Sequence, residues 1–384
     1  MLQRWMITLM VSAVGCVLVS SCGKKNYSPD EPLPTVYTPS VFISSQNQYL
    51  YAIDPVSGTE KWEFNLHGTT QATPVVVGRC IYAPTVDGLY KLDVNTGKQL
   101  YSNQGDSFKG IVSSPVTDGR LVYIASNNAS GGSLVMAIDP NNDAKAWTVS
   151  YNTTINSSLT LYQNKLFVAQ NDGTINCIST GNGAPVWTTP GSVPVIPGVG
   201  LFSSPAISYP YLYVGSSDGN LYALYLNNGA AAWNFAAGNI INSSPIVYGG
   251  NVIFGCNDNY VYCVDSVAKT IRWRFKTADR VISSPSANRN VIYIGGYDGV
   301  VYALNVVDGS VKWKYSTNAL LRSSVLNVDG DIYAASFDKN LYKLDTSGHL
   351  KWKYNVNGVI ESSPILYDYN SGKTYYPAIS GMYQ

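Results

Sequence analysis

The chain has 384 residues, of which 13% are charged, and its 25 Lys and Arg residues nearly balance its 24 Asp and Glu residues. Nucleic-acid binding depends on clustered cations that neutralise phosphates, and no basic run occurs here, so the composition argues against that class of partner. Tyr contributes 30 residues and no long stretch shows helical spacing of apolar residues, which indicates a β-rich protein. Length alone would allow two domains, but repeat architectures often run longer as one unit.

The first 21 residues are predicted to be a lipoprotein signal peptide. Arg4 precedes an apolar run, residues 5–19, which ends in the small residues of "VSSC" and is shorter than a bilayer-spanning helix requires. The sequence "LVSSC" resembles the lipobox of bacterial lipoproteins, in which the Cys becomes the lipidated first residue. This resemblance assigns Cys22 as the anchor, and an ordinary signal peptide with an incidental Cys is the alternative.

Residues 22–40 are then the lipidated Cys and a flexible tether. Four prolines, Pro29, Pro32, Pro34 and Pro39, keep the tether extended and unpaired. In lipoprotein sorting generally, Asp after the lipidated Cys retains a protein at the inner membrane, so Gly23 implies the outer membrane. The following "CGKKN" is basic rather than acidic, which favours a periplasm-facing anchor over display on the cell surface. Membrane contact is expected through the lipid anchor only.

The rest of the sequence repeats one unit eight times, as markers at both ends of each unit show. A small-residue triplet such as "SSP" (203–205) opens each unit, and an aromatic residue marks its end. The gaps between successive aromatics are 39, 46, 40, 46, 40, 40 and 39 residues. These aromatics are Trp62, Tyr101, Trp147, Trp187, Trp233, Trp273, Trp313 and Trp352.

Within a unit, apolar residues alternate with small or polar ones, as in "YLYVGSSDGNLYALYL" (211–226) around Asp218-Gly219. This dipeptide predicts a hairpin with a type I′ turn, whose two central residues both have positive φ. A second turn leads to the strand that carries the aromatic, so each unit is predicted to be a four-stranded meander. Further Asp-Gly hairpins are expected at 87–88, 172–173 and 298–299. The glycines of the second turn are Gly58, Gly97, Gly183, Gly229, Gly309 and Gly348.

One such sheet has two apolar faces and cannot bury both alone, whereas eight sheets arranged around an axis can. Residues 41–384 are therefore predicted to form a single all-β domain, an eight-bladed β-propeller of four-stranded antiparallel blades, with an open solenoid as the alternative. The chain ends favour closure, because residues 40–54 lack a first strand and "SSPILYD" (362–368) supplies one after the last Trp. Joining the N- and C-terminal strands closes the ring. The segment after Lys373 resembles a further strand that this count does not place.

The segments "AIDPVSGTEKW" (52–62), "YALNVVDGSVKW" (302–313) and "YKLDTSGHLKW" (342–352) resemble the A-x-D-x-x-T-G-x-x-x-W repeat of pyrroloquinoline-quinone-type propellers. The match recurs in register from residue 41 to residue 366. The resemblance implies that the aromatic of each outermost strand docks flat between adjacent blades, with Tyr101 a weaker substitute for Trp. Such contacts would stabilise the fold, since each aromatic can bury ~150–250 Å².

The resemblance also raises a quinone-dependent dehydrogenase as a candidate class. Those enzymes, as a family, bind Ca²⁺ through Glu, Asn and Asp, use an Asp base and often place a vicinal Cys–Cys disulfide over the cofactor. This sequence has no Cys-Cys pair, no c-type haem motif and no long insertion. Hydride transfer to a quinone needs a base and a cation at the reacting centre, and no residue stands out for either role. We therefore expect no enzyme activity, no cofactor and no metal.

The cysteines after the tether are expected to be free, buried thiols. Two of them, Cys177 and Cys263, stand where other repeats have Ala, a small filler. Cys256 and Cys263 flank a turn at Asp258-Asn259, and a register in which 263 faces 254 would place them diagonally, a poor geometry for a disulfide. The full set is Cys80, Cys177, Cys256 and Cys263.

Two departures from the repeat are candidate interaction surfaces. The first is the apolar insertion "TPGSVPVIPGVGLF" (189–202), which either docks a partner or folds back as a lid over the ring. Its apolar members are Val193, Val195, Ile196, Val199 and Leu201.

The second candidate surface consists of the residue before each small-residue start, predicted to ring one mouth of the central channel. Such a ring could hold a small polar ligand or a glycan, although a hydrated funnel is the more common outcome. Arg322 and Glu361 lie on adjacent units and are expected to pair. The ring comprises Gln71, Val112, Asn156, Phe202, Asn242, Ile282, Arg322 and Glu361.

We interpret the sequence as a lipid-anchored cell-envelope scaffold for protein–protein interaction. Its layout is similar to a non-enzymatic lipoprotein branch of these propellers that serves outer-membrane protein assembly, so a β-barrel assembly component is the expected kind of partner. The alternative is a glycan- or small-ligand-binding lipoprotein, which needs exposed aromatics at a channel mouth. A quinone-dependent dehydrogenase is the third class.

Overall fold

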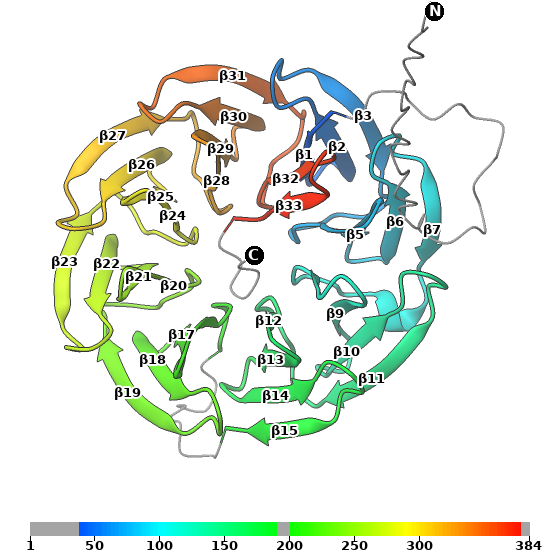
Figure 1. Cartoon of the computed structure of the whole chain (residues 1–384), viewed down its shortest axis with the longest axis horizontal. Helices are drawn as coiled ribbons and strands as arrows, with labels where there is room; N and C mark the ends of the chain where they lie inside the picture. Colours follow the sequence, from blue (N-terminus) through cyan, green and yellow to red (C-terminus); the bar gives the residue numbers. More distant parts are fainter. Residues whose placement is uncertain (1–37, 190–199, 378–384) are drawn as a thin grey trace, which may run out of the picture.

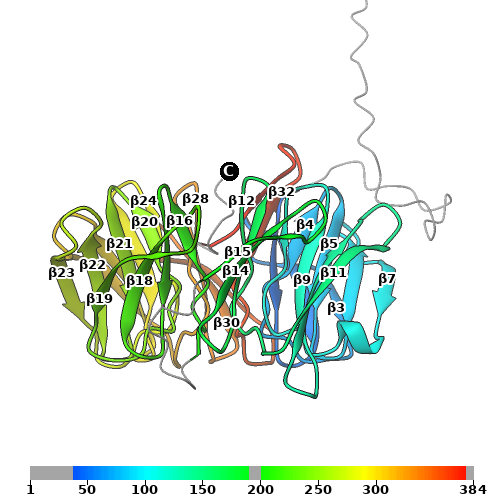
Figure 2. The same cartoon turned by 90° about the horizontal axis from the view of Figure 1, so that it is seen from below.

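The computed structural model describes residues 38–189 and 200–377, and these form a ring of β-sheets around a central axis (Figure 1). Within the described residues, 33 strands form eight antiparallel sheets, and a single three-residue 3-10 helix, η2 (Asp106–Phe108), accompanies them. Seen from the side, the ring is a disc whose strands run between its two faces (Figure 2). The predicted eight-bladed propeller of four-stranded antiparallel blades is therefore confirmed. None of the described segments forms an apolar helix long enough to cross a bilayer.

Seven of the eight blades are meanders whose innermost strand comes first in the chain, and blade 8 combines strands from both ends of the described chain. Blade 1 contains β4 (Val75–Val77), β5 (Cys80–Pro84), β6 (Leu89–Asp93) and β7 (Gln99–Asn103). Blade 2 contains β8 (Val116–Thr117), β9 (Val122–Asn127), β10 (Ser133–Ile138) and β11 (Lys145–Tyr151). Blade 3 contains β12 (Thr160–Tyr162), β13 (Lys165–Ala169), β14 (Ile175–Ser179) and β15 (Pro185–Thr188). Blade 4 contains β16 (Ala206–Ser208), β17 (Tyr211–Gly215), β18 (Asn220–Tyr225) and β19 (Ala231–Ala236).

The second half of the ring repeats this arrangement. Blade 5 contains β20 (Ile246–Tyr248), β21 (Asn251–Gly255), β22 (Tyr260–Asp265) and β23 (Ile271–Lys276). Blade 6 contains β24 (Ser286–Asn288), β25 (Val291–Gly295), β26 (Val300–Asn305) and β27 (Val311–Ser316). Blade 7 contains β28 (Leu326–Val328), β29 (Asp331–Ala335), β30 (Asn340–Leu344) and β31 (Leu350–Asn355). Blade 8 contains β1 (Ser40–Ser44), β2 (Tyr49–Ile53), β3 (Glu60–Asn65), β32 (Ile365–Asp368) and β33 (Lys373–Tyr375).

Blade 8 closes the ring by combining strands from both ends of the chain. Its strand order is β3-β2-β1-β32-β33, and Val41 of β1 pairs with Leu366 of β32. The Ser44 N–H donates to Ser362 Oγ at 3.0 Å, and that hydroxyl donates back to the Ser44 carbonyl at 2.8 Å. The predicted closure is confirmed. The segment after Lys373, which the sequence did not place, becomes β33, a fifth strand on the channel side of this blade (Figure 1).

Because the strands of a blade alternate in direction, successive turns lie on opposite faces of the ring, and the two faces therefore carry different turns. We call the face that carries the turns between second and third strands, such as Asp218-Gly219, the Asp face. The opposite face carries the turns between third and fourth strands, such as the one at Gly309. We call it the tether face, because the described chain begins there at Thr38, just before β1.

The Asp-Gly hairpins differ from the predicted type I′ turns. In blade 4 only Gly219 has positive φ, at 85°, and Gly215 pairs with Leu221 across the hairpin. The loop therefore has three central residues, with a left-handed residue in the last position, rather than two. The carboxylate of Asp218 accepts a hydrogen bond from the Asn220 N–H at 2.9 Å, which stabilises this longer loop. The two-residue prediction was wrong because it ignored this side-chain bond.

Two other hairpins depart from the prediction in different ways. In blade 5 the longer loop shifts the register by one residue, so Cys263 pairs with Ile253 rather than with Phe254. In blade 1 the Thr85 N–H donates to the Gly88 carbonyl at 2.8 Å, which makes residues 86 and 87 the centre of the turn. Asp87-Gly88 is thus displaced by one residue from the predicted position.

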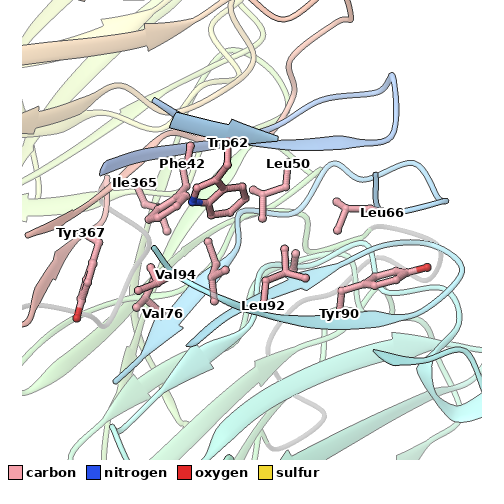
Figure 3. Close-up of a cluster of buried hydrophobic side chains, with 13 residues drawn as sticks. Phe42, Leu50, Trp62, Leu66, Val76, Tyr90, Leu92, Val94, Ile365 and Tyr367 are labelled. Atoms are coloured by element: carbon pink, nitrogen blue, oxygen red, sulfur yellow. The ribbon is translucent and has the colours of Figure 1, made fainter. Parts of the chain in front are cut away.

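The core of the protein lies between neighbouring blades. Strands such as β5 and β6 are buried along their whole length, whereas outer strands such as β27 alternate between exposed and half-buried residues. Figure 3 shows one cluster, in which Trp62 and Leu50 of blade 8 pack toward Leu92 and Val94 of blade 1. Each blade thus buries both of its faces against its two neighbours, as the ring geometry requires.

Candidate functional site: the channel and its two mouths

Eight residues from equivalent positions in the repeat line a cavity of about 470 Å³ at the channel mouth on the Asp face. Each of them precedes the innermost strand of its blade, so the ring symmetry brings them together from all eight blades. Two serines from the next row, Ser114 and Ser158, complete the lining. The eight are Gln71, Val112, Asn156, Phe202, Asn242, Ile282, Arg322 and Glu361, the same set that the repeat count brought together.

This mouth combines amides, one ion pair and apolar side chains. Arg322 Nη1 lies 3.0 Å from Glu361 Oε2, so the single cation and the single anion of the ring neutralise one another. Asn156 Oδ1 accepts a hydrogen bond from Asn127 at 3.2 Å. Phe202 is 45% exposed and is the one aromatic residue in the lining. The mouth can therefore offer hydrogen bonds and one ring face, but no unpaired charge.

Directly beneath this ring, the second small residue of each start triplet joins its blade to the next. The Ser158 N–H donates to Ser204 Oγ at 2.9 Å, and Ser204 N–H donates to Ser244 Oγ at the same distance. Seven of the eight blade junctions have this bond, including that from Ser363 to Thr73 across the closure, at 3.0 Å. In the sequence these residues served only as markers of where each repeat unit begins. Their recurring hydroxyl was the available signal for a hydrogen-bonded girdle around the channel.

A second cavity of about 470 Å³ opens at the tether-face end of the inner strands. Its wall includes the β4–β5 turn at Gly78, Tyr162 and Gln163 of blade 3, and Thr374 of β33. The Tyr376 hydroxyl accepts a hydrogen bond from the Val76 N–H at 3.0 Å, which fastens the C-terminal segment of blade 8 to blade 1. Burial raises the pKa of Tyr376 to about 12. The surplus strand is therefore a latch that spans the closure and covers part of this mouth.

The repeated Trp of one blade packs on the repeated Gly of the next. The indole N–H of Trp273 donates to the Val306 carbonyl at 2.9 Å, and a Cβ on Gly309 would lie 2.6 Å from the indole ring. Gly309 also has φ of 71°, a conformation that favours glycine. The Trp and the Gly of the motif are thus two halves of one inter-blade contact. The six contacts of this type pair Trp62 with Gly97, Trp147 with Gly183, Trp187 with Gly229, Trp273 with Gly309, Trp313 with Gly348 and Trp352 with Gly58.

Two blade junctions lack the glycine that the Trp covers in the other six. At that repeat position blades 2 and 5 carry Asp143 and Lys269, which follow Tyr101 and Trp233 around the ring. In the junction of Tyr101, the almost fully buried Lys91 forms an ion pair of 2.8 Å with Asp143. Its ammonium group also donates to the Pro140 carbonyl of blade 2 at 2.8 Å. A buried charge pair therefore accompanies the one position where Tyr replaces Trp.

The insertion at 189–202 lies mostly outside the described residues. This holds for Val193, Val195, Ile196 and Val199, as it does for Cys22, so their predicted roles stay predictions. Leu201 is buried and packs in a cluster with Phe167 and Leu212 of blades 3 and 4.

The cysteine prediction is correct for three residues and wrong for one. Cys177, Cys256 and Cys263 are free and buried. Burial raises the pKa of Cys177 to about 11 and the pKa of Cys256 and of Cys263 to about 12, so all three are protonated and unreactive at neutral pH. Cys80 is also buried, but it is disulfide-bonded, and its expected free thiol is therefore a wrong prediction.

The residues at the mouth do not fit the calcium–quinone centre of the enzymes that share the repeat. Calcium takes six to eight oxygen ligands, whereas the mouth has one carboxylate, Glu361, which is bound to Arg322. Within residues 38–189 and 200–377, no three His, Cys, Asp or Glu side chains gather in a way that could hold a metal ion. The turn aspartates serve the hairpins instead, as Asp298 does in accepting the Tyr302 hydroxyl at 2.6 Å.

The fold and its Trp–Gly contacts define a closed eight-bladed propeller of pyrroloquinoline-quinone-type repeats. The particular family follows from comparison with family models. The model described as outer membrane protein assembly factor BamB matches residues 27–130, 89–265 and 236–366. The chain belongs to this family.

Solved structures share the fold at low sequence identity. BamB from Moraxella catarrhalis is 17% identical, with a TM-score of 0.64 over 80% of this chain and 95% of that one. The computationally designed Ika8 protein is 12% identical, with a TM-score of 0.66 over 79% and 94%. The quinohemoprotein alcohol dehydrogenase ADHIIG from Pseudomonas putida HK5 is 13% identical, with a TM-score of 0.61 over 80% and 69%. A search of curated proteins found no significant match.

Proposed function

We propose that this protein is a lipid-anchored scaffold of the bacterial cell envelope that binds other proteins, and that its role belongs to outer-membrane protein assembly. The observation that carries the proposal is the family match, which spans nearly the whole propeller and bears the description of an outer-membrane assembly factor. The contact geometry supports it, because the repeated Trp, Gly and Ser residues all serve blade junctions and none is left for catalysis.

The proposal places Cys22 as the lipidated residue and residues 22–40 as the tether to the inner leaflet of the outer membrane. Residues 1–21 are the signal peptide that directs export, and the propeller faces the periplasm. Thr38 at the tether face is the point where this anchor reaches the ring. Lys61 of β3 holds it there, because its ammonium group donates to the Thr38 carbonyl at 2.9 Å.

Crosslinking in the native envelope followed by mass spectrometry tests the scaffold proposal. We expect the chain to be recovered with a component of the β-barrel assembly machinery. Two exposed aromatics on opposite faces provide a matched pair of variants. Phe202→Ser changes the Asp-face mouth beside the 189–202 insertion, and Tyr209→Ser changes the tether face, where Tyr209 is 78% exposed. Loss of the crosslink in Phe202→Ser alone would assign the docking face, and capture of oligosaccharide with no protein partner would sink the scaffold proposal.

A second candidate function is binding of a glycan or small polar ligand at the Asp-face mouth. The observation that favours it is Phe202, an exposed aromatic at the rim of a cavity lined by three amide side chains. Carbohydrate rings stack on such aromatics and bond to such amides. Calorimetric titration with neutral oligosaccharides tests this function, since binding should be lost in Phe202→Ala and in Asn242→Ala. Absence of heat with the unmodified protein removes this candidate.

A quinone-dependent dehydrogenase is the third class. It predicts a calcium-dependent spectral change and dye reduction when pyrroloquinoline quinone is added to the protein. We expect neither, because the one carboxylate among the described residues of the mouth, Glu361, is paired with Arg322 rather than free to bind calcium.

A further inference from the structure

The ring is electrostatically divided, although the whole chain is almost neutral. Residues 38–265 contain 8 Lys and Arg against 13 Asp and Glu, whereas residues 266–356 contain 13 against 7. The second segment covers the outer strand of blade 5 and blades 6 and 7. The excess positive charge is thus confined to one side of the ring.

Most of this excess lies on three consecutive outer strands, β23, β27 and β31, which form the outside of the ring (Figure 1). Their sequences, "IRWRFK", "VKWKYS" and "LKWKYN", turn the Trp and the next aromatic inward and place a cation at the exposed positions between them. We call these seven cations the basic wall. They are Arg272, Arg274, Lys276, Lys312, Lys314, Lys351 and Lys353, all exposed.

Protection of exposed strand edges does not account for the wall. Lys on an outer strand is a common device against edge-to-edge aggregation. The outer strands of blades 1 to 4 present the same kind of edge, yet β7, β11, β15 and β19 carry a single cation, Lys145. A need common to all blades would have placed cations on all of them.

The wall retains most of its charge for an external partner. Arg272 pairs with Asp265 at 2.8 Å and Lys351 pairs with Asp331 at 2.7 Å. Among the described residues, Lys312, Lys314 and Lys353 have no carboxylate within ion-pair distance. These cations are free to meet an anionic surface.

Exposed apolar residues line the edge of the wall at the tether face. Val267 and Val307 occupy the turns that precede β23 and β27, and they are 84% and 68% exposed. Val56 takes the same turn position in blade 8 and is 84% exposed. The corresponding residues of blades 1, 2 and 4 are Asn. Ile271, Val311 and Leu350, each more than 40% exposed at the first position of its outer strand, extend this apolar rim.

The anchor point of the chain lies next to this surface. Thr38 is held on the tether face of blade 8, which follows blade 7 around the ring. Thr38 lies sixteen positions after Cys22, a span of at most about 55 Å when fully extended. A tether of that length keeps the apolar rim and the wall within reach of the leaflet that holds the anchor.

We propose that the basic wall and its apolar rim dock on an anionic lipid surface, so that the anchored propeller lies with the outer strands of blades 5 to 7 against the membrane and blades 1 to 4 toward its partners. The proposal rests on the lipid-anchored scaffold function. Cations attracted to anionic headgroups and valines that enter the interface are the combination that interfacial binding requires. The proposal extends membrane contact beyond the lipid anchor.

Site-directed fluorescence on the full chain, reconstituted in vesicles, tests the docked orientation. An environment-sensitive label at Val307→Cys reports on the rim, and a label at Asn141→Cys, the same repeat position in blade 2, is its matched control. All four native cysteines of the described propeller are fully buried, so the label goes to the introduced one. With vesicles of phosphatidylethanolamine and phosphatidylglycerol we expect headgroup-attached quenchers to quench label 307 and to spare label 141, at low salt only. With phosphatidylcholine vesicles neither label should be quenched.

A set of charge variants distinguishes the effect of cations in the basic wall from the effect of the net charge of the protein. Lys312→Gln, Lys314→Gln, Lys351→Gln and Lys353→Gln together remove four wall cations, and the control removes Lys98, Lys109, Lys145 and Lys165 in the same way. One cation beside an anionic leaflet changes docking roughly fivefold, so the wall variant should lower the docked-to-undocked ratio ~100-fold or more and the control should not. Equal quenching of labels 307 and 141, or equal loss in both variants, overturns the proposal. Loss of a protein crosslink without any lipid effect would assign the wall to an acidic protein instead.

The experiment distinguishes loss of the lipid anchor from loss of docking by the basic wall. An acylated chain sediments with phosphatidylcholine vesicles whether or not the wall docks. A chain that leaves those vesicles but still shows salt-sensitive quenching at label 307 with anionic vesicles retains the wall and loses the anchor.

Discussion

At the residue scale, the Trp and Gly of the repeat have a single physical purpose. The indole covers the glycine of the next blade so closely that a methyl group would meet the ring at 2.5–2.8 Å in all six such contacts. The sequence predicts that the Trp docks between blades and that the Gly forms a turn, but it does not connect the two residues. The connection could not be predicted, because the two residues belong to different repeats and meet only when neighbouring blades pack.

Gly309→Ala is expected to lower stability more than an equivalent change at a glycine without a ring above it. The added Cβ would meet Trp273 at 2.6 Å, and overpacking of this kind costs about 1–3 kcal/mol beyond the backbone penalty. Gly119→Ala is the matched control, because Gly119 also has positive φ, 80°, but no atom lies within 4 Å of its added Cβ. Thermal unfolding of the two variants measures the difference, and equal midpoints would show that the ring contact contributes nothing.

At the scale of elements, the channel-side strand starts form a girdle. Each bond runs from a backbone N–H of one blade to a serine or threonine hydroxyl of the next, and most of these groups are buried. A buried N–H left without a partner costs about 1–3 kcal/mol. The sequence shows directly that these residues are small. It could not show that their hydroxyl groups bond to the next blade, because those bonds depend on how the blades are arranged around the axis.

Ser284→Ala should destabilise the propeller, because Ser284 Oγ accepts the Ser244 N–H at 2.9 Å. The expected loss is about 1 kcal/mol, the usual net contribution of one hydrogen bond, because this bond is only partly buried. Ser324→Ala is the matched control, because within the described residues this hydroxyl receives no such bond from the preceding blade. Denaturant unfolding of both variants checks the prediction, which fails if the two lose the same free energy of unfolding.

The Asp hairpins link neighbouring blades and make stability depend on acid. Burial works to raise the pKa of Asp338, but hydrogen bonds from Tyr342, the Asn318 N–H and Asn340 outweigh it and lower that pKa. A carboxyl whose pKa is lower in the folded state stabilises the fold above its ordinary pKa and loses that contribution as the pH falls. The Asn318 bond comes from the preceding blade, at 3.0 Å. Protonation therefore weakens a junction as well as a turn.

The thermal midpoint of the unmodified protein should fall as the pH drops below about 4, the ordinary range of an Asp carboxyl. Asp338→Asn removes one of the titrating groups, so its midpoint should be lower at neutral pH and should fall less on acidification. Unfolding scans between neutral pH and strong acid measure both slopes. Parallel slopes for the two proteins would contradict a role for this carboxylate.

At the scale of the whole molecule, closure combines two devices. Hydrogen-bonded pairing of β1 with β32 completes blade 8, and β33 with Tyr376 then fastens blade 8 to blade 1. Trp352 and Lys343 of blade 7 also meet blade 8 at one point, since both donate to the Pro55 carbonyl, at 3.1 and 2.6 Å. The Trp352 bond has counterparts at four other junctions, such as that of Trp273 to the Val306 carbonyl, whereas the β1–β32 pairing and the Tyr376 bond belong to the closure.

Tyr376→Ala should open the latch and destabilise the ring, by less than the ~3–5 kcal/mol that deletion of a fully buried aromatic costs, because Tyr376 is partly buried. Tyr376→Phe keeps the ring and removes only the hydroxyl that accepts the Val76 N–H, so it should cost about 1 kcal/mol. Hydrogen exchange at β4 and β32 localises the effect, since both strands should exchange faster in Tyr376→Ala. Unchanged exchange there would show that the latch does not stabilise the closure.

The sequence by itself determined the architecture, because the eight repeats, their period-two pattern and the split blade are local patterns of apolar and turn residues. It also identified the eight residues that line the cavity at the channel mouth. In a ring of equivalent blades, residues at the same position of each repeat lie at the same distance from the axis, so they come together. Tertiary structure alone decided which groups meet across blades: the Trp–Gly contacts, the hydroxyl girdle, the Lys91–Asp143 pair and the place of β33. Side chains that are distant in sequence become neighbours only after the blades pack. The repeat pattern alone does not give the distances between side chains of different blades.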